Sequence, residues 1–257
     1  MGAAEGSDKT AREGLPGFFC SANPANSGLQ RGGAVCGRFV VFSNLERLVV
    51  HFAIDRVEAP VAASYNVAPS QPVAAVVRRE DQNLLVHLRW GLVPFWAKDA
   101  AIANRLINAR AETAADKPSF RAAFRKRRCL VAADGFYEWR GARGRKQPVY
   151  ITLPEEAPMA FAGLWEVWDD RGRAAAPLKT CTILTTTASS ALREIHDRMP
   201  LILKPAAYRA WLDPQLQDPD LAHILAHRTH RDFRFWPVST AVNAVRNDSP
   251  ELIAVLS

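Results

Sequence analysis

Cys36 is the residue best suited to act as a nucleophile. It is followed by Gly37, Arg38 and the apolar run 39–42, a pattern that predicts a thiol at the head of a buried strand. Gly37 lets the backbone come close to a bound group, and the guanidinium fork of Arg38 suits a phosphate or a carboxylate. On these residues alone a buried structural cysteine is the better interpretation, because free cysteine is among the most buried residue types.

Two further residues are candidates for proton transfer. Alternation along 134–139 places Glu138 with Phe136 on a buried face and Tyr137 on the other face, and a buried carboxyl group is costly unless it is paired or protonated. Glu138 is therefore a candidate general acid or base with a raised pKa, the alternative being an exposed Glu on an edge strand. His196 lies in a compact His-Asp-Arg sequence ahead of a proline, which suits proton transfer better than a lone His does.

Other residues have the types that contact a polyanion. Asn108 and Arg110 share one face of an extended segment, unless they are a turn Asn and a solvated Arg. Trp96, in the aromatic loop 90–96, is either a core residue or partly exposed for base stacking. Thr185 offers a hydroxyl to a phosphate, or satisfies a strand end. The densest basic cluster is Arg121, Arg125, Lys126, Arg127 and Arg128, beside Arg140, Arg143, Arg145 and Lys146. A phosphate-facing surface and a solvated face both fit that cluster.

These residues need a scaffold, and the hydrophobic pattern predicts mainly strands. We expect helices over 45–52 with Ser43 or Asn44 as the N-cap, over 117–128 with Phe120 and Phe124 facing inward, and over 205–212 and 221–227. The expected strands are 39–42, 73–78, 84–90, 129–132, 149–153, 161–168, 181–187, 235–239 and 252–256, with a hairpin joining 73–78 to 84–90 and loops at 53–63 and around Gly172. This order predicts an α+β fold, a single compact domain with a largely antiparallel, barrel-like central sheet flanked by helices.

Composition limits the class of protein. The chain has 257 residues, of which 48% are hydrophobic, and a formal net charge of +7, which favours a polyanionic partner. The four Cys residues are scattered without a C-x-x-C pair, and there is no Walker-type loop, dinucleotide Gly pattern or H-E-x-x-H motif. No apolar run is long enough to span a membrane. We therefore expect a cytoplasmic protein with no metal, no cofactor and no membrane contact.

Residues 1–34 differ from the rest of the sequence. They are rich in Gly and poor in apolar residues, and their positive and negative charges cancel. We expect this segment to be disordered and the folded domain to comprise residues 35–257.

Taken together, five stretches resemble the SRAP family (SOS response-associated peptidase). They are Cys36-Gly37-Arg38-Phe39, Tyr65-Asn66-Val67-Ala68-Pro69, Asn108–Thr113, Asp134–Trp139 and Ile195–Pro200. They lie in the family's order and spacing, and the match runs from about residue 35 to the end of the chain. The resemblance implies a compact domain around a barrel-like sheet, with a basic channel for DNA. It also implies a covalent link to abasic sites in single-stranded DNA, and we expect a monomer.

The resemblance assigns a role to each matching residue. In the family an N-terminal Cys joins its α-amine and its thiol to the aldehyde of the opened sugar, which gives a thiazolidine. On that basis Cys36 is the nucleophile, Asn108 positions its amine, Glu138 shuttles protons and His196 assists opening of the sugar ring. The residues expected to bind DNA are Arg38, Arg110 and Arg198 at phosphates, Pro69 and Trp96 at bases, and Thr185.

The sequence departs from the family pattern just before Cys36. The family begins Met-Cys-Gly-Arg with the Met removed, whereas Val35 precedes Cys36 in this chain. An internal Cys36 has no free amine. We expect either a cut that exposes Cys36, which the domain could make itself, or a translation start at position 35, and we favour the second.

Two other functions fit part of the pattern. A thiol peptidase acting on other proteins would use Cys36, Glu138 and His196, but it leaves the basic surface and the aromatic loop unexplained. A non-enzymatic module that binds single-stranded DNA explains the charge and the aromatic residues, but it has no use for Cys36 at the head of the domain.

Overall fold

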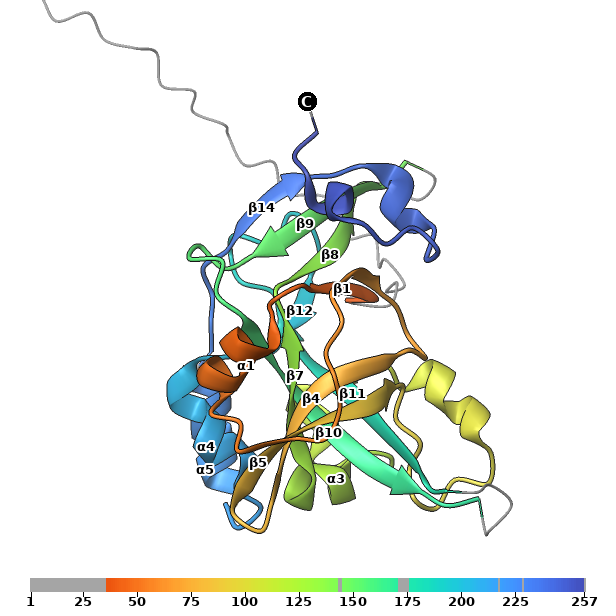
Figure 1. The fold of residues 1–257 in the computed structure, drawn as a ribbon, viewed down its shortest axis with the longest axis vertical. Coiled ribbons are helices and arrows are strands. Elements are labelled where there is room, and N and C mark those ends of the chain that lie inside the picture. Colours follow the sequence, from red (N-terminus) through yellow and green to blue (C-terminus); the bar gives the residue numbers. More distant parts are fainter. Residues whose placement is uncertain (1–35, 143–144, 171–175, 217, 228, 257) are drawn as a thin grey trace, which may run out of the picture. The chain divides into compact units, whose positions relative to one another are not determined.

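The strands of this chain form two sheets, whose pairing brings distant parts of the sequence together (Figure 1). The computed structural model describes residues 36–142, 145–170, 176–216, 218–227 and 229–256. Residues 1–34, Arg143 and the loop predicted around Gly172 lie outside that description. The described residues belong to the compact unit Gly33–Ser257.

The first sheet is antiparallel and has the strand order β14-β9-β8-β1-β3. Its strands are β1 (Arg38–Val41), β3 (Ser64–Val67), β8 (Gly135–Arg140), β9 (Gln147–Thr152) and β14 (Arg234–Pro237). Strand β1 pairs with β8 in the register Arg38↔Tyr137 and Phe39↔Phe136. This register brings the residue that leads into β1, Cys36, beside the second half of β8.

The second sheet closes on itself. Strands β11, β10, β7, β4 and β5 are antiparallel neighbours in that order, and β5 returns to β11 through a short parallel pairing at Cys181↔Trp90. The strands of this sheet are β2 (Arg56–Val57), β4 (Pro72–Arg79), β5 (Gln82–Trp90), β6 (Asn108–Arg110), β7 (Arg128–Ala133), β10 (Met159–Trp168), β11 (Leu178–Thr187), β12 (Arg198–Pro200) and β13 (Ile202–Leu203). The closure confirms the predicted barrel-like, largely antiparallel sheet and the α+β class.

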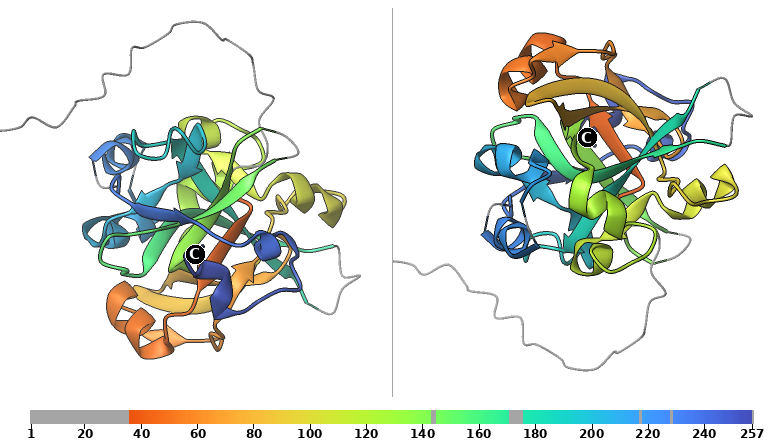
Figure 2. Two further views of the ribbon diagram at one scale, coloured as in Figure 1. Left: turned by 90° about the horizontal axis from the view of Figure 1, so that it is seen from above. Right: turned by 90° about the horizontal axis from the view of Figure 1, so that it is seen from below.

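Both faces of the closed sheet are packed. One face carries Trp90, Val131 and Phe161 in a cluster that also contains Cys36 and Phe39. The helices cover the opposite face. They are α1 (Leu45–Phe52), α2 (Ala111–Ala114), α3 (Arg121–Lys126), α4 (Tyr208–Leu212) and α5 (Asp218–His227), with the 3₁₀ helix η2 (Pro205–Ala207). The 3₁₀ helices η3 (Thr240–Asn243) and η4 (Pro250–Ile253) pack on the first sheet instead, and η1 (Ala100–Arg105) lies between β5 and β6. In both views of Figure 2, α1, α4 and α5 lie on the same side of the strands. Among the described residues, no helix combines the length and apolarity needed to cross a bilayer.

Several elements form where the sequence predicts them. Helix α1 spans the predicted residues, and the side chain of Asn44 caps it by accepting a hydrogen bond from the Arg47 amide at 2.9 Å. The hairpin β4–β5 turns at Glu80 and Asp81, both with positive φ of 48° and 63°. Two successive residues with positive φ are typical of a tight two-residue hairpin turn.

Other predicted elements are wrong. The helix predicted over 117–128 is reduced to α3, because Arg128 already begins β7. The segment predicted as a strand over 252–256 is not one, since η4 occupies Pro250–Ile253. The loop predicted over 53–63 contains β2, which pairs in parallel with β5. In each case pairing with a distant strand, or a proline that starts a helical turn, overrides the local pattern.

Candidate active site

Cys36 and Glu138 are in direct contact. The backbone N–H of Cys36 donates to Oε1 of Glu138 at 2.6 Å, over a separation of 102 residues. The pairing of β1 with β8 makes this contact, because it aligns the lead into β1 with the second half of β8. Cys36 has φ of 45°, a left-handed conformation that is uncommon for a residue with a Cβ. Such backbone conformations cluster at functional sites.

Burial sets the proton affinity of both groups. Glu138 is 4% exposed, and desolvation raises its pKa to about 7 although the backbone N–H groups of Cys36 and Trp139 oppose the rise. Desolvation, and then the negative charge of Glu138, raise the pKa of the Cys36 thiol well above its ordinary value. At neutral pH the site therefore holds a protonated thiol beside a carboxyl group that is close to half ionised. The prediction of a buried Glu138 with a raised pKa is confirmed.

His196 shares its electrostatic surroundings with Glu138. Burial lowers the pKa of the imidazole, Lys146 lowers it further and Asp197 opposes the change. The same two groups shift the pKa of Glu138 in the same directions: Lys146 lowers it and Asp197 raises it. Nδ1 of His196 accepts a hydrogen bond from the Arg198 amide at 3.0 Å. Nδ1 also lies 2.9 Å from Oδ1 of Asp197, a contact that becomes an ion pair when the imidazole is protonated, so His196 can take up a proton and pass it on.

Asn108 and Arg110 lie on one strand, as predicted. Strand β6 pairs in parallel with β11, with Asn108 opposite Ile183 and Arg110 opposite Thr185. Side chains two apart on a strand lie on the same face, and the intervening Ala109 is buried. Asn108 is half-buried and Arg110 is exposed.

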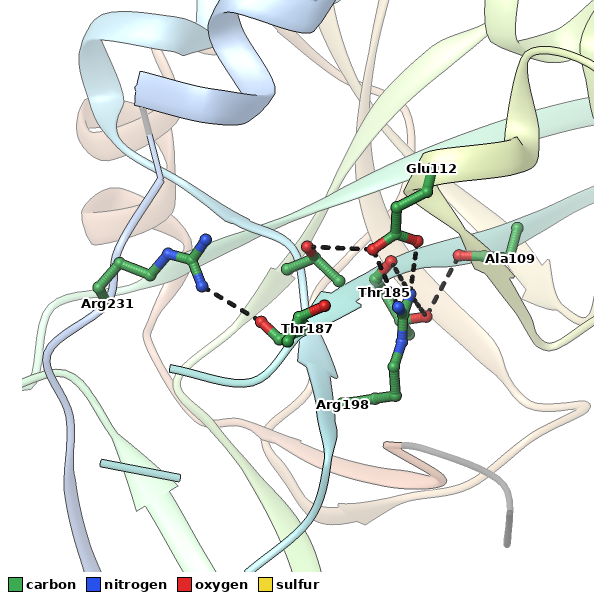
Figure 3. A network of polar contacts seen from close by, with 7 residues as sticks. Ala109, Glu112, Thr185, Thr187, Arg198 and Arg231 are labelled. Carbon is green, nitrogen blue, oxygen red and sulfur yellow. Dashed lines mark hydrogen bonds and ion pairs between the residues drawn. The ribbon is translucent and has the colours of Figure 1, made fainter. Parts of the chain in front are cut away.

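Arg198 is held inside a polar network (Figure 3). Its Nη1 and Nη2 donate to the two oxygens of Glu112, each at 2.9 Å, and Nη2 also donates to the Thr185 carbonyl at 2.6 Å. Partial burial raises the pKa of Glu112, but hydrogen bonds, the one from Arg198 first, outweigh this effect and leave that pKa below its ordinary value. Thr185 is buried and its hydroxyl lies 3.2 Å from Nη2 of Arg198. The network joins the segment after β6 to the strand that follows His196.

The guanidinium of Arg38 is held by the buried side-chain amide of Asn66. Its Nη1 donates to Oδ1 of Asn66 at 2.8 Å and to the Val242 carbonyl at 2.7 Å. Asn66 is 2% exposed, and its Nδ2 donates to the carbonyls of Val242, Ala244 and Asn247. These contacts attach the segment after η3 to the strand pair that carries Cys36. They leave Arg38 partly exposed, with its guanidinium in a fixed direction.

The two tryptophans of the aromatic loop have different environments. Trp90 is fully buried, and its Nε1 donates to the Ile107 carbonyl at 2.8 Å. Trp96 is 48% exposed, and its Nε1 lies 3.4 Å from the Pro118 carbonyl. Pro69 is half-buried at the end of the segment that follows β3. Trp96 thus has a ring available for contact with a ligand, whereas Trp90 belongs to the core.

The predicted surface position of Arg128 is wrong. Arg128 does not belong to a basic surface, because it is 3% exposed and its guanidinium donates to backbone carbonyls, among them those of Trp211 and Phe124. Tyr137 lies on the face of β8 opposite Phe136, as the alternation predicts, and it is equally buried because Val242 and Leu252 cover that face. Arg127 also forms an ion pair, with its Nη2 2.7 Å from Oε2 of Glu166. The exposed cations of α3 are Arg121, Arg125 and Lys126.

Sequence reasoning did not single out Glu112 and Asn66, which hold the two arginines in place. Both lie inside stretches that carry chemistry, Glu112 two residues after Arg110 and Asn66 inside Tyr65–Pro69. Charge complementarity could have suggested Glu112 as a partner for an arginine. Among the described residues, no three His, Cys, Asp or Glu side chains are grouped so as to hold a metal ion.

Comparison with known proteins shows the family to which this chain belongs. A family model described as "SOS response associated peptidase (SRAP)" matches residues 35–245. The abasic site processing protein YoqW of Bacillus subtilis is 44% identical over 224 residues, which are 85% of this chain and 99% of that protein. The abasic site processing protein YedK of Escherichia coli is 32% identical over 227 residues, again 85% of this chain and 99% of that protein.

Solved structures have a similar fold. A protein from Bacteroides thetaiotaomicron superposes with a TM-score of 0.75 at 23% identity, covering 86% of this chain and 100% of that chain. A protein from Bordetella bronchiseptica gives a TM-score of 0.68 at 27% identity, covering 79% of this chain and 100% of that chain.

Proposed function

Since the chain belongs to the SRAP family, we propose that it processes abasic sites in single-stranded DNA by bonding covalently to them through Cys36. The relatives named as abasic site processing proteins supply the substrate class. The contact between the Cys36 nitrogen and Glu138 is the observation that carries the proposed chemistry.

The proposed reaction begins at the nitrogen of Cys36. A ring-opened abasic site presents an aldehyde, and a neutral α-amine adds to its carbon and loses water to give a Schiff base. The sulfur of Cys36 then bonds to the same carbon while the thiol proton moves to the nitrogen. The product is a five-membered thiazolidine. Ring closure removes the Schiff base, which could otherwise undergo β-elimination of the 3′ phosphate, so the bonded strand is protected.

Glu138 is placed to move the protons that these steps require. Its Oε1 lies 2.6 Å from the nitrogen that becomes the amine, within reach for direct transfer. In the 257-residue chain burial raises the pKa of this carboxyl group to about 7. A carboxyl group so buried can accept a proton from the amine and then donate it to the departing water. His196 would take up a proton, with Asp197 beside its Nδ1 at 2.9 Å to pair with the imidazolium, and would then donate it to the ring oxygen as the sugar opens. Asn108 would orient the amine.

The residues predicted to bind DNA would hold the strand around Cys36. Arg38, Arg110 and Arg198 are proposed to contact phosphates, with Arg38 and Arg198 already oriented by Asn66 and Glu112. Trp96 offers an exposed ring for base stacking, and Pro69 lies beside the buried segment that positions it. Thr185 would act through Arg198, because its side chain is buried against that guanidinium.

The reaction requires that Cys36 be the first residue. In the 257-residue chain the nitrogen of Cys36 is an amide nitrogen joined to Val35, and an amide does not form a Schiff base. We propose that the active protein begins at Cys36. If the chain is cut there, Glu138 is close enough to protonate the departing nitrogen of Cys36.

The thiol peptidase alternative has less support. A peptidase of that kind attacks with a thiolate, whereas burial and the charge of Glu138 hold the Cys36 thiol in its protonated form. In the proposed reaction the amine attacks first, so no thiolate has to form before the strand is bound.

One trapping experiment tests the proposed function. The protein beginning at Cys36 is mixed with single-stranded DNA that carries one abasic site, with the same strand intact, and with a peptide. An adduct that survives denaturation should form with the first substrate alone. An adduct on the intact strand, or cleavage of the peptide without any adduct, would contradict the proposal.

A further inference from the structure

A hollow lies beside the exposed ring of Phe95, away from Cys36 in the sequence. Its volume is about 420 Å³, and it is lined by Phe95, Ala122, Arg125, Lys126, Arg127 and Glu166. Sites for small molecules and cofactors occupy roughly 300–1,000 Å³. Phe95 is 59% exposed, a large apolar area for a ring that has no part in the core.

The charges around this hollow favour an anionic ligand. Glu166, the acidic residue of the lining, is 4% exposed and is neutralised by Arg127 at 2.7 Å. The side chains of Arg125 and Lys126 are exposed, and within the described residues neither makes a hydrogen bond or an ion pair. An aromatic face next to two uncommitted cations is the combination that single-stranded nucleic acids use, because a base stacks on the ring and a phosphate meets the cation.

We propose that this hollow is a subsite for a nucleotide of the strand beyond the lesion, with its base on Phe95 and its phosphate on Arg125 and Lys126. The proposal rests on the proposed function and adds a second point of contact to it. It also gives a use to that part of the basic cluster which remains exposed once Arg127 and Arg128 are committed.

The chain connects this subsite to the candidate active site. Arg110, at the end of β6, is followed directly by α2 and then by α3, which carries both cations. Trp96 reaches the middle of this run through Pro118, and Phe95 precedes Trp96 in sequence. Arg110, Trp96 and the hollow therefore belong to one continuous piece of structure. A strand that leaves the lesion past Arg110 and Trp96 would next meet Phe95.

The test separates long strands from short ones. Three proteins that begin at Cys36 are compared: the parent, Phe95→Ala, and the double variant Arg125→Ala with Lys126→Ala. Each is given abasic strands of about 4 and about 16 nucleotides, the range that one binding fold covers. Arg47→Ala with Lys204→Ala is the matched control, because it removes the same charge from two exposed residues near α1 and α4.

We expect Phe95→Ala to bind the long strand at least about fivefold more weakly, the loss of one stacked base, and Phe95→Trp to restore binding. For the double variant, the slope of log binding constant against log salt concentration should become shallower by about 0.7 for each cation removed. The control should leave this slope unchanged. Crosslinking of the short strand should be unchanged in every variant. With the lesion placed at either end of the long strand, the Phe95 effect should appear for one polarity and vanish for the other.

Several results would overturn the subsite. One is that Phe95→Ala binds the long strand as tightly as the parent protein. Another is that it loses the short strand by the same factor, which would assign Phe95 to the lesion site itself. Polyglutamate binding with the same dependence on Phe95 would indicate a partner that is an acidic polypeptide. If the parent protein crosslinks no abasic strand at all, the proposed function fails, whereas the length dependence of binding can still be measured on intact DNA.

Discussion

The contact between Cys36 and Glu138 and the contact between Arg198 and Glu112 differ in burial and in charge. Glu138 is 4% exposed and its acid form is favoured, so its pKa rises to about 7. The side chains of Arg198 and Glu112 are 15% and 46% exposed, and both are charged. Burial at the first contact prepares a group to exchange protons, whereas ion pairing at the second fixes the direction of a permanent charge.

The two contacts also lie in different parts of the fold. The first lies between β1 and β8, whose faces are covered by the core and by the C-terminal segment. The second lies where β6 and β12 flank β11 in the closed sheet. A site that must desolvate a reacting nitrogen and also meet a charged strand can use a buried pair for the first task and an exposed pair for the second.

Cys36→Ala should have the largest effect, because it removes the sulfur that closes the ring. We expect no adduct that survives denaturation, measured on a denaturing gel with abasic single-stranded DNA. Cys181→Ala is the matched control, since Cys181 is equally buried but lies in β11. The control should retain the adduct and lose about 1 kcal/mol of unfolding free energy. An adduct formed by Cys36→Ala would refute thiazolidine closure.

Glu138→Gln should follow in size. Loss of a general acid–base slows a reaction by about 10²–10⁴-fold, and we expect a decrease in the rate of adduct formation within that range. Affinity for the intact strand should stay the same, because Glu138 is buried and makes no contact with a phosphate in this scheme. His196→Ala should behave in the same direction. Loss of affinity in step with loss of rate would show that these groups hold the strand.

Stability against pH provides a second test of Glu138. Its folded-state pKa is raised from 4.5 to about 7, so the folded protein binds a proton that the unfolded chain releases. Its contribution to stability is present below pH 4.5 and is lost as the pH rises through about 7. Relative to Glu138→Gln, the parent protein should lose on the order of 3 kcal/mol over this interval. Parallel pH profiles in urea denaturation would contradict the assigned pKa.

The Cys36–Glu138 contact also shows how far the sequence predicts this structure. Alternation along 134–139 predicts a buried Glu138, and the helix over 45–52, the β4–β5 hairpin and the closed sheet agree with local patterns and the family resemblance. The partner of Glu138 follows from a register over 102 residues, which no local pattern encodes. Arg128 was predicted on the surface because its neighbours are basic, whereas β7 draws it inward. Pairing between distant strands determines the partner of Glu138 and the burial of Arg128, which the local sequence does not specify.

Glu112→Gln should have an intermediate effect, at the second contact. It removes the charge that holds Arg198, and we expect adduct formation to slow by roughly tenfold through misplacement of the guanidinium. The stability loss should be about 0.5–1 kcal/mol, since the pair is partly exposed. Glu156→Gln is the control, because it breaks the exposed pair with Arg234. If both variants react at the parent rate, Glu112 has no part in positioning.

Arg110→Ala should have the smallest effect. Arg110 is exposed. Loss of one phosphate contact should make the slope of log binding constant against log salt concentration shallower by about 0.7. The rate of adduct formation at saturating DNA should change little. An unchanged salt dependence would place Arg110 outside the path of the strand.

The requirement for a free amine on Cys36 is the central claim, and intact-mass measurement of adduct formation tests it most directly. Two proteins are compared, one beginning at Cys36 and one retaining Val35 with its amino terminus acetylated. The first should gain the mass of the abasic strand less one water, with the bond mapped to Cys36 and resistant to borohydride. The second should gain nothing. Equal rates of adduct formation by both proteins would contradict the claim.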